Sequence, residues 1–263
     1  MTTPVTSVAR KRFEAALAAR RALKMIAGIA NHDVNSVRTI AEAAELARVH
    51  ALDVAADADV IRAARAAFSG FLFASGITAD ELMLAVDCGV DGIELGNFDA
   101  LYAEGVFLDH HQVLARVADT LQRLAAVERR VFFSVTIPGH LSSETQVALA
   151  EALEVMGVDL IQTEGAARLL DATPAVAELS LNEKAAITLN NTRLLASATR
   201  LPVMSASGIG LNNLAAPFAM GAACVGIGSA VNKLANRDAM ITTLAAMMAT
   251  LEASPEMAAM AAV

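Results

Sequence analysis

The feature that most constrains how this chain folds is a regular alternation of short apolar runs with longer amphipathic segments. Strict alternation of strand and helix requires parallel strands joined by helical crossovers. The sequence contains eight such units, and eight units close into a barrel. The expected strands are residues 24–29, 51–54, 70–74, 92–95, 130–135, 160–162, 202–205 and 223–227. We therefore predict a protein of the α/β class that forms a single (β/α)₈ TIM barrel.

The segments between these runs have helical periodicity. Val37, Ile40, Ala41 and Ala44 follow the spacing that places apolar side chains on one face of a helix. The first residues alternate Arg and Ala and lack the apolar core of a secretory signal, so they predict an extra helix across the barrel bottom. The expected organisation is a capping helix within residues 1–22 and a barrel over residues 23–263, with no linker between them.

A weak internal repeat sets the register of the even strands. Three segments share the order of helix end, glycine, short turn and strand, and a looser fourth copy precedes residue 53. Aligning the copies places Asp53, Glu94, Gln162 and Gly226 at one height, with Asp53 and Glu94 pointing into the barrel. Two carboxylates that share a partly buried layer shift one pKa upward, which is typical of a general acid or base.

Composition excludes several classes of function. The formal charge of −8, a single Tyr and the lack of Trp argue against nucleic-acid binding. No apolar run has the length of a membrane span. Cys88 and Cys224 stand alone, so neither a zinc site nor a disulfide framework is indicated, and we expect a reducing, cytoplasmic environment.

Two late turns indicate a phosphate site. The seventh and eighth expected strands each end in Gly and Ser, and a helix opens after the eighth. Exposed backbone N–H groups and a helix N-terminus at one place suit a dianionic phosphate, and this corner is a frequent phosphate site in (β/α)₈ barrels. The residues predicted to bind phosphate are Ser205, Ser207, Gly208, Gly226, Gly228 and Ser229.

The remaining candidates lie at the carboxyl ends of the strands, where barrel enzymes place their active sites. Asp53, Glu94, Glu164 and His140 are the predicted catalytic residues. The predicted substrate-binding residues beyond the phosphate turns are Asn31, Asn97, Thr136, Gln162 and Lys233. A Mg²⁺ ion held by these oxygens is an open alternative, but no spacing motif supports it and the metal stays unknown.

Lysine placement bears on Schiff-base chemistry, which needs an amine near the strand tips. Lys24 begins the first expected strand, so we expect it near the opposite end of the barrel. Lys184 follows a long loop and could be carried inward, whereas Lys233 is better placed to neutralise phosphate. The sequence therefore weakens an aldolase mechanism.

Several of these segments together resemble a known family. They are KMIAGIANHD at 24–33, LDVAAD at 52–57, IELGNFD at 93–99, SVTIPGH at 134–140, IQTEG at 161–165, SASGI at 205–209 and VGIGSAVNKL at 225–234. In this order they look like the hypothetical chloroplast open reading frame twenty-three family of plastids, cyanobacteria and other bacteria. The resemblance implies a (β/α)₈ fold of the aldolase and phosphate-binding type, and it supplies no reaction.

Three functions are compatible with these residues. The first is a metabolic enzyme that anchors a small phosphorylated substrate and transfers a proton by a carboxylate, as an isomerase, lyase or synthase does. The second is a flavin-dependent oxidoreductase, in which the same corner holds the phosphate of FMN. The third is a non-catalytic sensor of a phosphorylated ligand. The C-terminal segment, rich in Ala and Met, adds the expectation of a homo-oligomer.

Overall fold

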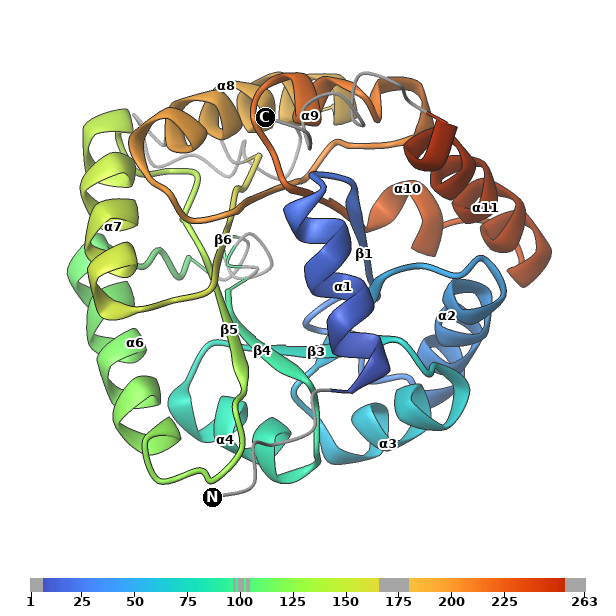
Figure 1. Cartoon of the computed structure of the whole chain (residues 1–263), viewed down its shortest axis with the longest axis horizontal. Helices are drawn as coiled ribbons and strands as arrows, with labels where there is room; N and C mark the ends of the chain where they lie inside the picture. Colours follow the sequence, from blue (N-terminus) through green and yellow to red (C-terminus); the bar gives the residue numbers. More distant parts are fainter. Residues whose placement is uncertain (1–6, 97, 99–101, 103–104, 166–179, 254–263) are drawn as a thin grey trace.

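The computed structural model describes residues 7–96, 98, 102, 105–165 and 180–253. Eight parallel strands follow one another around a closed barrel, and β1 pairs with β8 to complete it. Figure 1 shows the helices as a ring outside these strands. The strands are β1 (Ala22–Ile26), β2 (Ala51–Ala55), β3 (Phe71–Gly76), β4 (Gly92–Leu95), β5 (Phe132–Thr136), β6 (Leu160–Gln162), β7 (Val203–Ala206) and β8 (Cys224–Ile227). The predicted (β/α)₈ barrel is thus confirmed.

The long helices follow the strands in alternation, and their apolar faces pack on the sheet. In α2 the periodic residues Val37, Ile40, Ala41 and Ala44 are all buried, as their spacing predicts. The helices are α1 (Val8–Ala18), α2 (Val34–Leu46), α3 (Ala58–Ala67), α4 (Ala79–Asp87), α6 (His110–Leu124), α7 (Ser143–Met156), α8 (Leu181–Ala198), α9 (Ala216–Ala219), α10 (Ser229–Asn232) and α11 (Arg237–Ala253), with a 3₁₀ turn η2 (Leu211–Asn213).

The first strand lies earlier in the chain than the sequence indicates. The expected strand covers 24–29, whereas β1 begins at Ala22 and ends at Ile26. Gly28 has φ 115, a left-handed conformation that breaks the extended chain and that glycine adopts at little cost. Apolar character continues past the strand because the exit loop lines the barrel mouth, and hydropathy alone does not distinguish the two.

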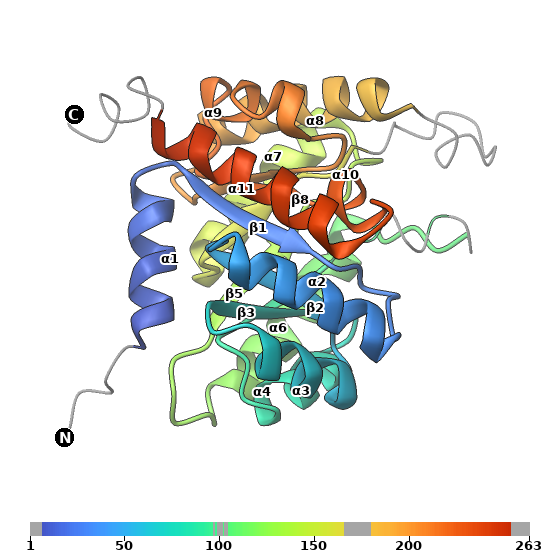
Figure 2. The ribbon, with the colours of Figure 1, turned by 90° about the vertical axis from the view of Figure 1, so that its right-hand side faces the viewer.

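Helix α1 lies across the amino-terminal end of the barrel (Figures 1 and 2). Its Phe13 packs against Phe71, Phe73 and Phe132 inside the barrel, with ring centroids 4.7, 5.5 and 5.7 Å away. All four rings are buried. This end of the barrel is therefore filled by apolar side chains.

The strand register stacks the interior in layers. Each even strand is advanced by two residues relative to the previous even strand, as tilted strands require. The register therefore puts Asp53, Glu94, Gln162 and Gly226 in one layer, in agreement with the repeat. The layer beneath it contains Lys24, Phe73, Ser134 and Met204. The repeat glycines Gly89, Gly157 and Gly221 all have positive φ where a helix gives way to the next strand.

The apolar face of α11 is covered within the same chain. Met240, Leu244, Met247 and Leu251 are buried, and the helix packs alongside α2. The rest of the Ala- and Met-rich C-terminal segment, residues 254–263, lies outside the described residues, and homo-oligomerisation remains a prediction. None of the helices in the described part of the chain combines the length and the apolar character needed to span a bilayer.

Candidate active site

A cavity of about 600 Å³ opens at the carboxyl ends of β1, β6, β7 and β8. Of the described residues that line it, Glu164 is the carboxylate, and Lys184 and Lys233 are the cations. The other lining residues are Ile26, Gly28, Ile29, Ala30, Asn31, Gln162, Thr163, Leu181, Ala206, Ser207, Gly208, Ile209, Gly226, Gly228 and Ser229. The two predicted phosphate turns therefore meet at one cavity.

The turn after β7 directs backbone donors toward this cavity. Thr188 on α8 donates its hydroxyl to the carbonyl oxygens of Ala206, at 3.0 Å, and Ser207, at 2.9 Å. In a trans peptide the N–H points opposite to the C=O. The N–H groups of Ser207 and Gly208 thus point away from α8, toward the side on which both residues line the cavity.

Close packing of α8 explains why glycine follows Ser207. Gly208 has φ 72, and a Cβ there would lie 2.4 Å from the amide nitrogen of Ala185 and 2.6 Å from the carbonyl oxygen of Leu181. Ser207 itself has φ 85, an unusual value for a residue with a side chain. The first turns of α8 are thereby held against the phosphate turn, and the positive end of this helix lies beside the cavity.

The turn after β8 contributes open space. A Cβ on Gly226 would lie 2.9 Å from both Ala206 Cβ and Ile26 Cδ1, so a side chain there would crowd the cavity floor. Ser229 begins α10, whose first N–H groups have no acceptor within the helix. Lys233 follows α10 with an exposed side chain, whereas Lys184 is half-buried in the first turn of α8.

Glu164 is held at the cavity wall by two donors. The Tyr102 hydroxyl donates to Glu164 Oε2 at 2.6 Å, and the Gly139 N–H donates to the same oxygen at 3.1 Å. His140 Nδ1 lies 3.1 Å from the Tyr102 hydroxyl. The structure thus joins two predicted catalytic residues, Glu164 and His140, through Tyr102.

The aromatic ring of Phe107 fixes Tyr102 and His140. It stacks on Tyr102 with centroids 5.0 Å apart and meets the His140 ring edge-on at 5.6 Å. Burial lowers the pKa of His140 below 6.5, and a backbone hydrogen bond to Leu108 opposes this shift. The imidazole is therefore mostly neutral at pH 7, as a proton carrier requires.

A second polar cluster lies deeper in the barrel. Lys24 Nζ lies 2.7 Å from Glu94 Oε2 and 3.2 Å from Asp53 Oδ2, and all three side chains are at most 1% exposed. Ser75 donates to Asp53 at 2.7 Å and Ser134 donates to Glu94 at 2.8 Å. Burial raises the pKa of Glu94, Lys24 and Ser134 oppose that shift, and the Asp53 charge reinforces it.

The prediction for Lys24 was wrong. It lies in the middle of β1 and its ammonium enters the carboxylate layer, instead of lying near the far end of the barrel. Burial lowers its pKa but the two carboxylates outweigh burial, so the pKa is raised above 10.5. A charged amine without a solvent path is a poor nucleophile, so Schiff-base chemistry remains disfavoured for a different reason.

Several predicted site residues do not line the cavity. Asp53 and Glu94 point inward as predicted, but their oxygens are engaged with Lys24 and the serines. The prediction for Ser205 was wrong: it accepts a hydrogen bond from Thr192 of α8 at 2.8 Å, because alternation along β7 turns it outward. Thr136 lies inside the barrel and accepts from Gln162 Nε2 at 3.1 Å. Asn97 lies outside the described residues.

Asn31 lines the cavity and donates from Nδ2 to the Ala27 carbonyl at 3.3 Å, which stabilises the β1 exit loop. The described residues contain no group of three or more His, Cys, Asp and Glu side chains that could hold a metal ion. Cys88 and Cys224 are free thiols.

Sequence reasoning missed one residue of these clusters, Tyr102, and misplaced another, Lys24. Tyr102 comes from the segment after β4, where neither hydropathy nor spacing marks it, although a single Tyr in the chain was a signal. Lys24 was considered but placed at the wrong height, because layers alternate between odd and even strands and an error of two residues in the strand start moves a side chain by two layers.

Known structures share the barrel fold of this chain. Solved barrels match over almost their whole length: (S)-3-O-geranylgeranylglyceryl phosphate synthase from Thermoplasma acidophilum has a TM-score of 0.59 at 17% identity, covering 95% of this chain and 100% of that chain. 3-Hexulose-6-phosphate synthase from Salmonella typhimurium has a TM-score of 0.63 at 12% identity, covering 88% and 98%. These identities show the fold alone, a (β/α)₈ barrel.

The family is shown by sequence. The chain belongs to the family described as protein of unknown function (DUF561), whose model matches residues 8–257. The relative named uncharacterized protein ycf23 from Cyanophora paradoxa is 33% identical over 226 residues, which cover 86% of this chain and 90% of the relative. Its namesake from Pyropia yezoensis is 31% identical over 222 residues, covering 84% and 79%. The resemblance to the chloroplast open reading frame twenty-three family is confirmed.

Proposed function

We propose that this protein is an enzyme that holds a small phosphorylated compound in the barrel-mouth cavity and transfers a proton on its carbon skeleton through Glu164. The reaction is of the isomerase, lyase or synthase type. The observation that carries the proposal is the cavity itself, which has two Gly/Ser turns and two lysines at one side and one buried carboxylate at another.

The phosphate end rests on backbone donors and charge. The N–H groups of Ser207 and Gly208, the first turn of α10 and the ammonium groups of Lys184 and Lys233 together supply hydrogen bonds and positive charge around one space. The names of three structural neighbours also contain phosphate compounds: a geranylgeranylglyceryl phosphate synthase bound to sn-glycerol-1-phosphate, a hexulose phosphate synthase and an orotidine 5'-phosphate decarboxylase. Because their sequences are distant, they support the substrate class only.

The position of each predicted carboxylate relative to the cavity indicates which one acts as the general base. Glu164 lines the cavity, whereas Asp53 and Glu94 are paired with Lys24 in the layer that forms its floor. A general base has to come within hydrogen-bond reach of the proton that it removes. We therefore assign the base to Glu164 and a supporting role to Asp53 and Glu94, which lie in the same layer as Gln162 and Gly226 of the cavity floor.

The test combines binding with exchange. Thermal unfolding is measured with inorganic phosphate, dihydroxyacetone phosphate, fructose 6-phosphate and glucose 6-phosphate, and deuterium uptake into C–H bonds of the sugar phosphates is followed by NMR in D₂O. We expect stabilisation by phosphate compounds and uptake next to the carbonyl of at least one of them. The Glu164→Gln variant should retain binding and lose uptake by a factor of about 10² to 10⁴. Absence of stabilisation by every phosphate compound contradicts the proposal.

The two alternatives are separated by the same preparation. An FMN-dependent oxidoreductase would carry or take up a flavin, which its yellow colour and absorption of visible light report directly. A sensor would bind phosphate compounds in wild type and in Glu164→Gln alike and exchange no protons in either.

A further inference from the structure

We propose that Tyr102 and His140 form a proton relay that connects Glu164 with solvent. The inference rests on the proposed function of Glu164 and deepens it, because a base that removes a proton inside a cavity has to return to its starting state. The relevant groups are the Glu164 carboxylate, the Tyr102 hydroxyl and the His140 imidazole.

The geometry places one hydroxyl between two proton carriers. The Tyr102 oxygen lies 2.6 Å from Glu164 Oε2 and 3.1 Å from His140 Nδ1. A phenol has one proton, so it donates to one neighbour and accepts from the other. If it donates to Glu164, then Nδ1 carries a proton and donates to the phenol oxygen. If it donates to Nδ1, then Glu164 is protonated.

The two arrangements differ by one relayed proton. A proton enters at Nε2 of His140, the Nδ1–H bond breaks, that proton passes to the Tyr102 oxygen, and the phenol proton forms the new O–H bond on Glu164. The phenol and the imidazole end with the same number of protons as before, and the carboxylate gains one. Transfer in the opposite direction removes from Glu164 the proton that it took from a substrate, and no other reactant is needed.

Solvent exposure indicates that protons enter and leave the relay at His140. Glu164 and Tyr102 are 3% and 8% exposed, whereas His140 is partly open to solvent. Among the described residues, the imidazole is faced by the Tyr102 hydroxyl and ring, the Phe107 ring and the Leu108 backbone, with the Glu164 carboxylate behind the hydroxyl. Because Phe107 packs on both rings, the hydroxyl stays in line between the carboxylate and the imidazole.

The Gly139 N–H strengthens the assignment. It donates to the same Glu164 oxygen as Tyr102, and a hydrogen bond to a carboxylate favours its ionised form, which is the form that removes a proton from a substrate. Gly139 and His140 are neighbours on the turn after β5. The turn after β5 therefore contacts Glu164 through Gly139 and supplies His140, the two ends of the proposed relay.

A first experiment needs no substrate. Histidine-labelled wild type, Tyr102→Phe and Glu164→Gln are titrated by ¹⁵N NMR, and we follow the ring nitrogens of His140. Removing the Glu164 charge should lower the pKa of His140 further, and removing the phenol should shift its Nδ1 resonance. The same His140 titration in all three proteins would overturn the relay.

A second experiment measures deuterium uptake into the sugar phosphate that exchanges fastest. Tyr102→Phe and His140→Ala should slow uptake at saturating substrate by at least about tenfold with little change in KM, and added imidazole should restore the rate of His140→Ala. His111→Ala, which changes an exposed residue of α6, is the matched control. Uptake that is unaffected in both variants refutes the relay and leaves the proposed function standing. If the His140 titration depends on Tyr102 and Glu164 but no sugar phosphate takes up deuterium, the proposed function is refuted and the hydrogen-bonded connection from Glu164 to His140 is retained.

Discussion

The two ends of the barrel are built from opposite kinds of residue. The amino-terminal end contains Phe13, Phe71, Phe73 and Phe132, with the Lys24 cluster above them, and α1 lies across it (Figure 2). The carboxyl-terminal end contains glycine and serine turns around a cavity of about 600 Å³. One end is filled by large side chains and the other is kept open by small ones.

The boundary between these regions runs through a single layer. On the β2 and β4 side, Asp53 and Glu94 are buried against Lys24. On the β6 and β8 side, Gln162 and Gly226 line the cavity. The carboxylates that stabilise the interior and the carboxylate that faces the cavity are therefore different residues, which mutation can separate.

The largest expected effect is at the closed end. Lys24→Met leaves two buried carboxylates without their cation, and breaking a buried ion pair costs about 3 to 5 kcal/mol of unfolding free energy. Urea unfolding measures the loss. The double variant Lys24→Met/Glu94→Gln should recover part of it, because one of the unpaired charges is gone. A loss below about 1 kcal/mol in the single variant would show that the cluster is not a charged unit.

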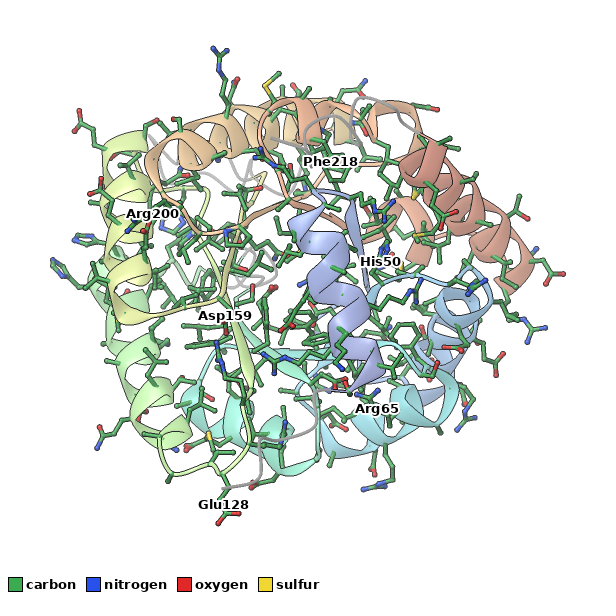
Figure 3. All side chains as sticks on the ribbon, viewed as in Figure 1. His50, Arg65, Glu128, Asp159, Arg200 and Phe218 are labelled. Carbon is green, nitrogen blue, oxygen red and sulfur yellow. The ribbon has the colours of Figure 1, made fainter. Side chains whose placement is uncertain are left out.

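The next effect is a pH dependence of the unfolding free energy, and it arises at the amino-terminal end of the barrel. His50 precedes β2 near α1 (Figure 3), and its Nδ1 accepts from the Leu23 N–H at 3.3 Å. Burial, aided by Arg12 and Arg21, lowers the pKa of His50 from 6.5 to about 4. The unfolded chain then binds more protons between these values, so stability falls as the pH drops from 6.5 toward 4, by about 3 kcal/mol.

His50→Asn keeps an acceptor and removes the titration, so its unfolding free energy should depend less on pH across that interval. His111→Asn on exposed α6 is the control and should retain the wild-type slope. Equal slopes in the wild type and in His50→Asn would show that folding does not lower the pKa of His50.

A smaller effect is expected at the cavity floor. In Gly226→Ala the new methyl would lie 2.9 Å from Ala206 Cβ and Ile26 Cδ1, and overpacking of this kind costs about 1 to 3 kcal/mol. Phosphate compounds should also bind more weakly. Gly210→Ala is the matched control, because its Cβ would meet Ala230 Cβ at 3.5 Å on extended backbone. Isothermal titration and thermal unfolding distinguish the two variants.

The smallest effect separates the two lysines. Lys184 is half-buried and Lys233 is exposed, so water screens the second more strongly. Lys184→Gln should weaken binding of inorganic phosphate about tenfold, and Lys233→Gln should weaken it less. Both losses should shrink as salt concentration rises. A larger loss in Lys233→Gln would reverse the proposed order of contacts.

Much of the fold could be predicted because its signals are local. The alternation of strand and helix, the helical periodicity of residues such as Val37 and Ile40, and the turn glycines depend on short stretches of chain. The register of Asp53, Glu94, Gln162 and Gly226 also followed, because a repeated segment occupies equivalent places in a closed barrel.

The site was predicted in part. The two phosphate turns were found because their Gly and Ser residues follow neighbouring strands, yet Ser205 was assigned to the wrong face and Asp53 and Glu94 were not separated from the cavity. An error of one or two residues at a strand end changes which side or which layer a side chain occupies.

The sequence by itself determined the barrel, the acidic layer within it and the glycine turns at its mouth, because each follows from spacing along the chain. Only the tertiary structure decided that Lys24 pairs with Asp53 and Glu94, and that Tyr102 joins Glu164 to His140. These contacts join residues that lie 29, 38, 62 and 70 positions apart in the sequence. No local pattern specifies which polar groups a closed barrel will bring within bonding distance.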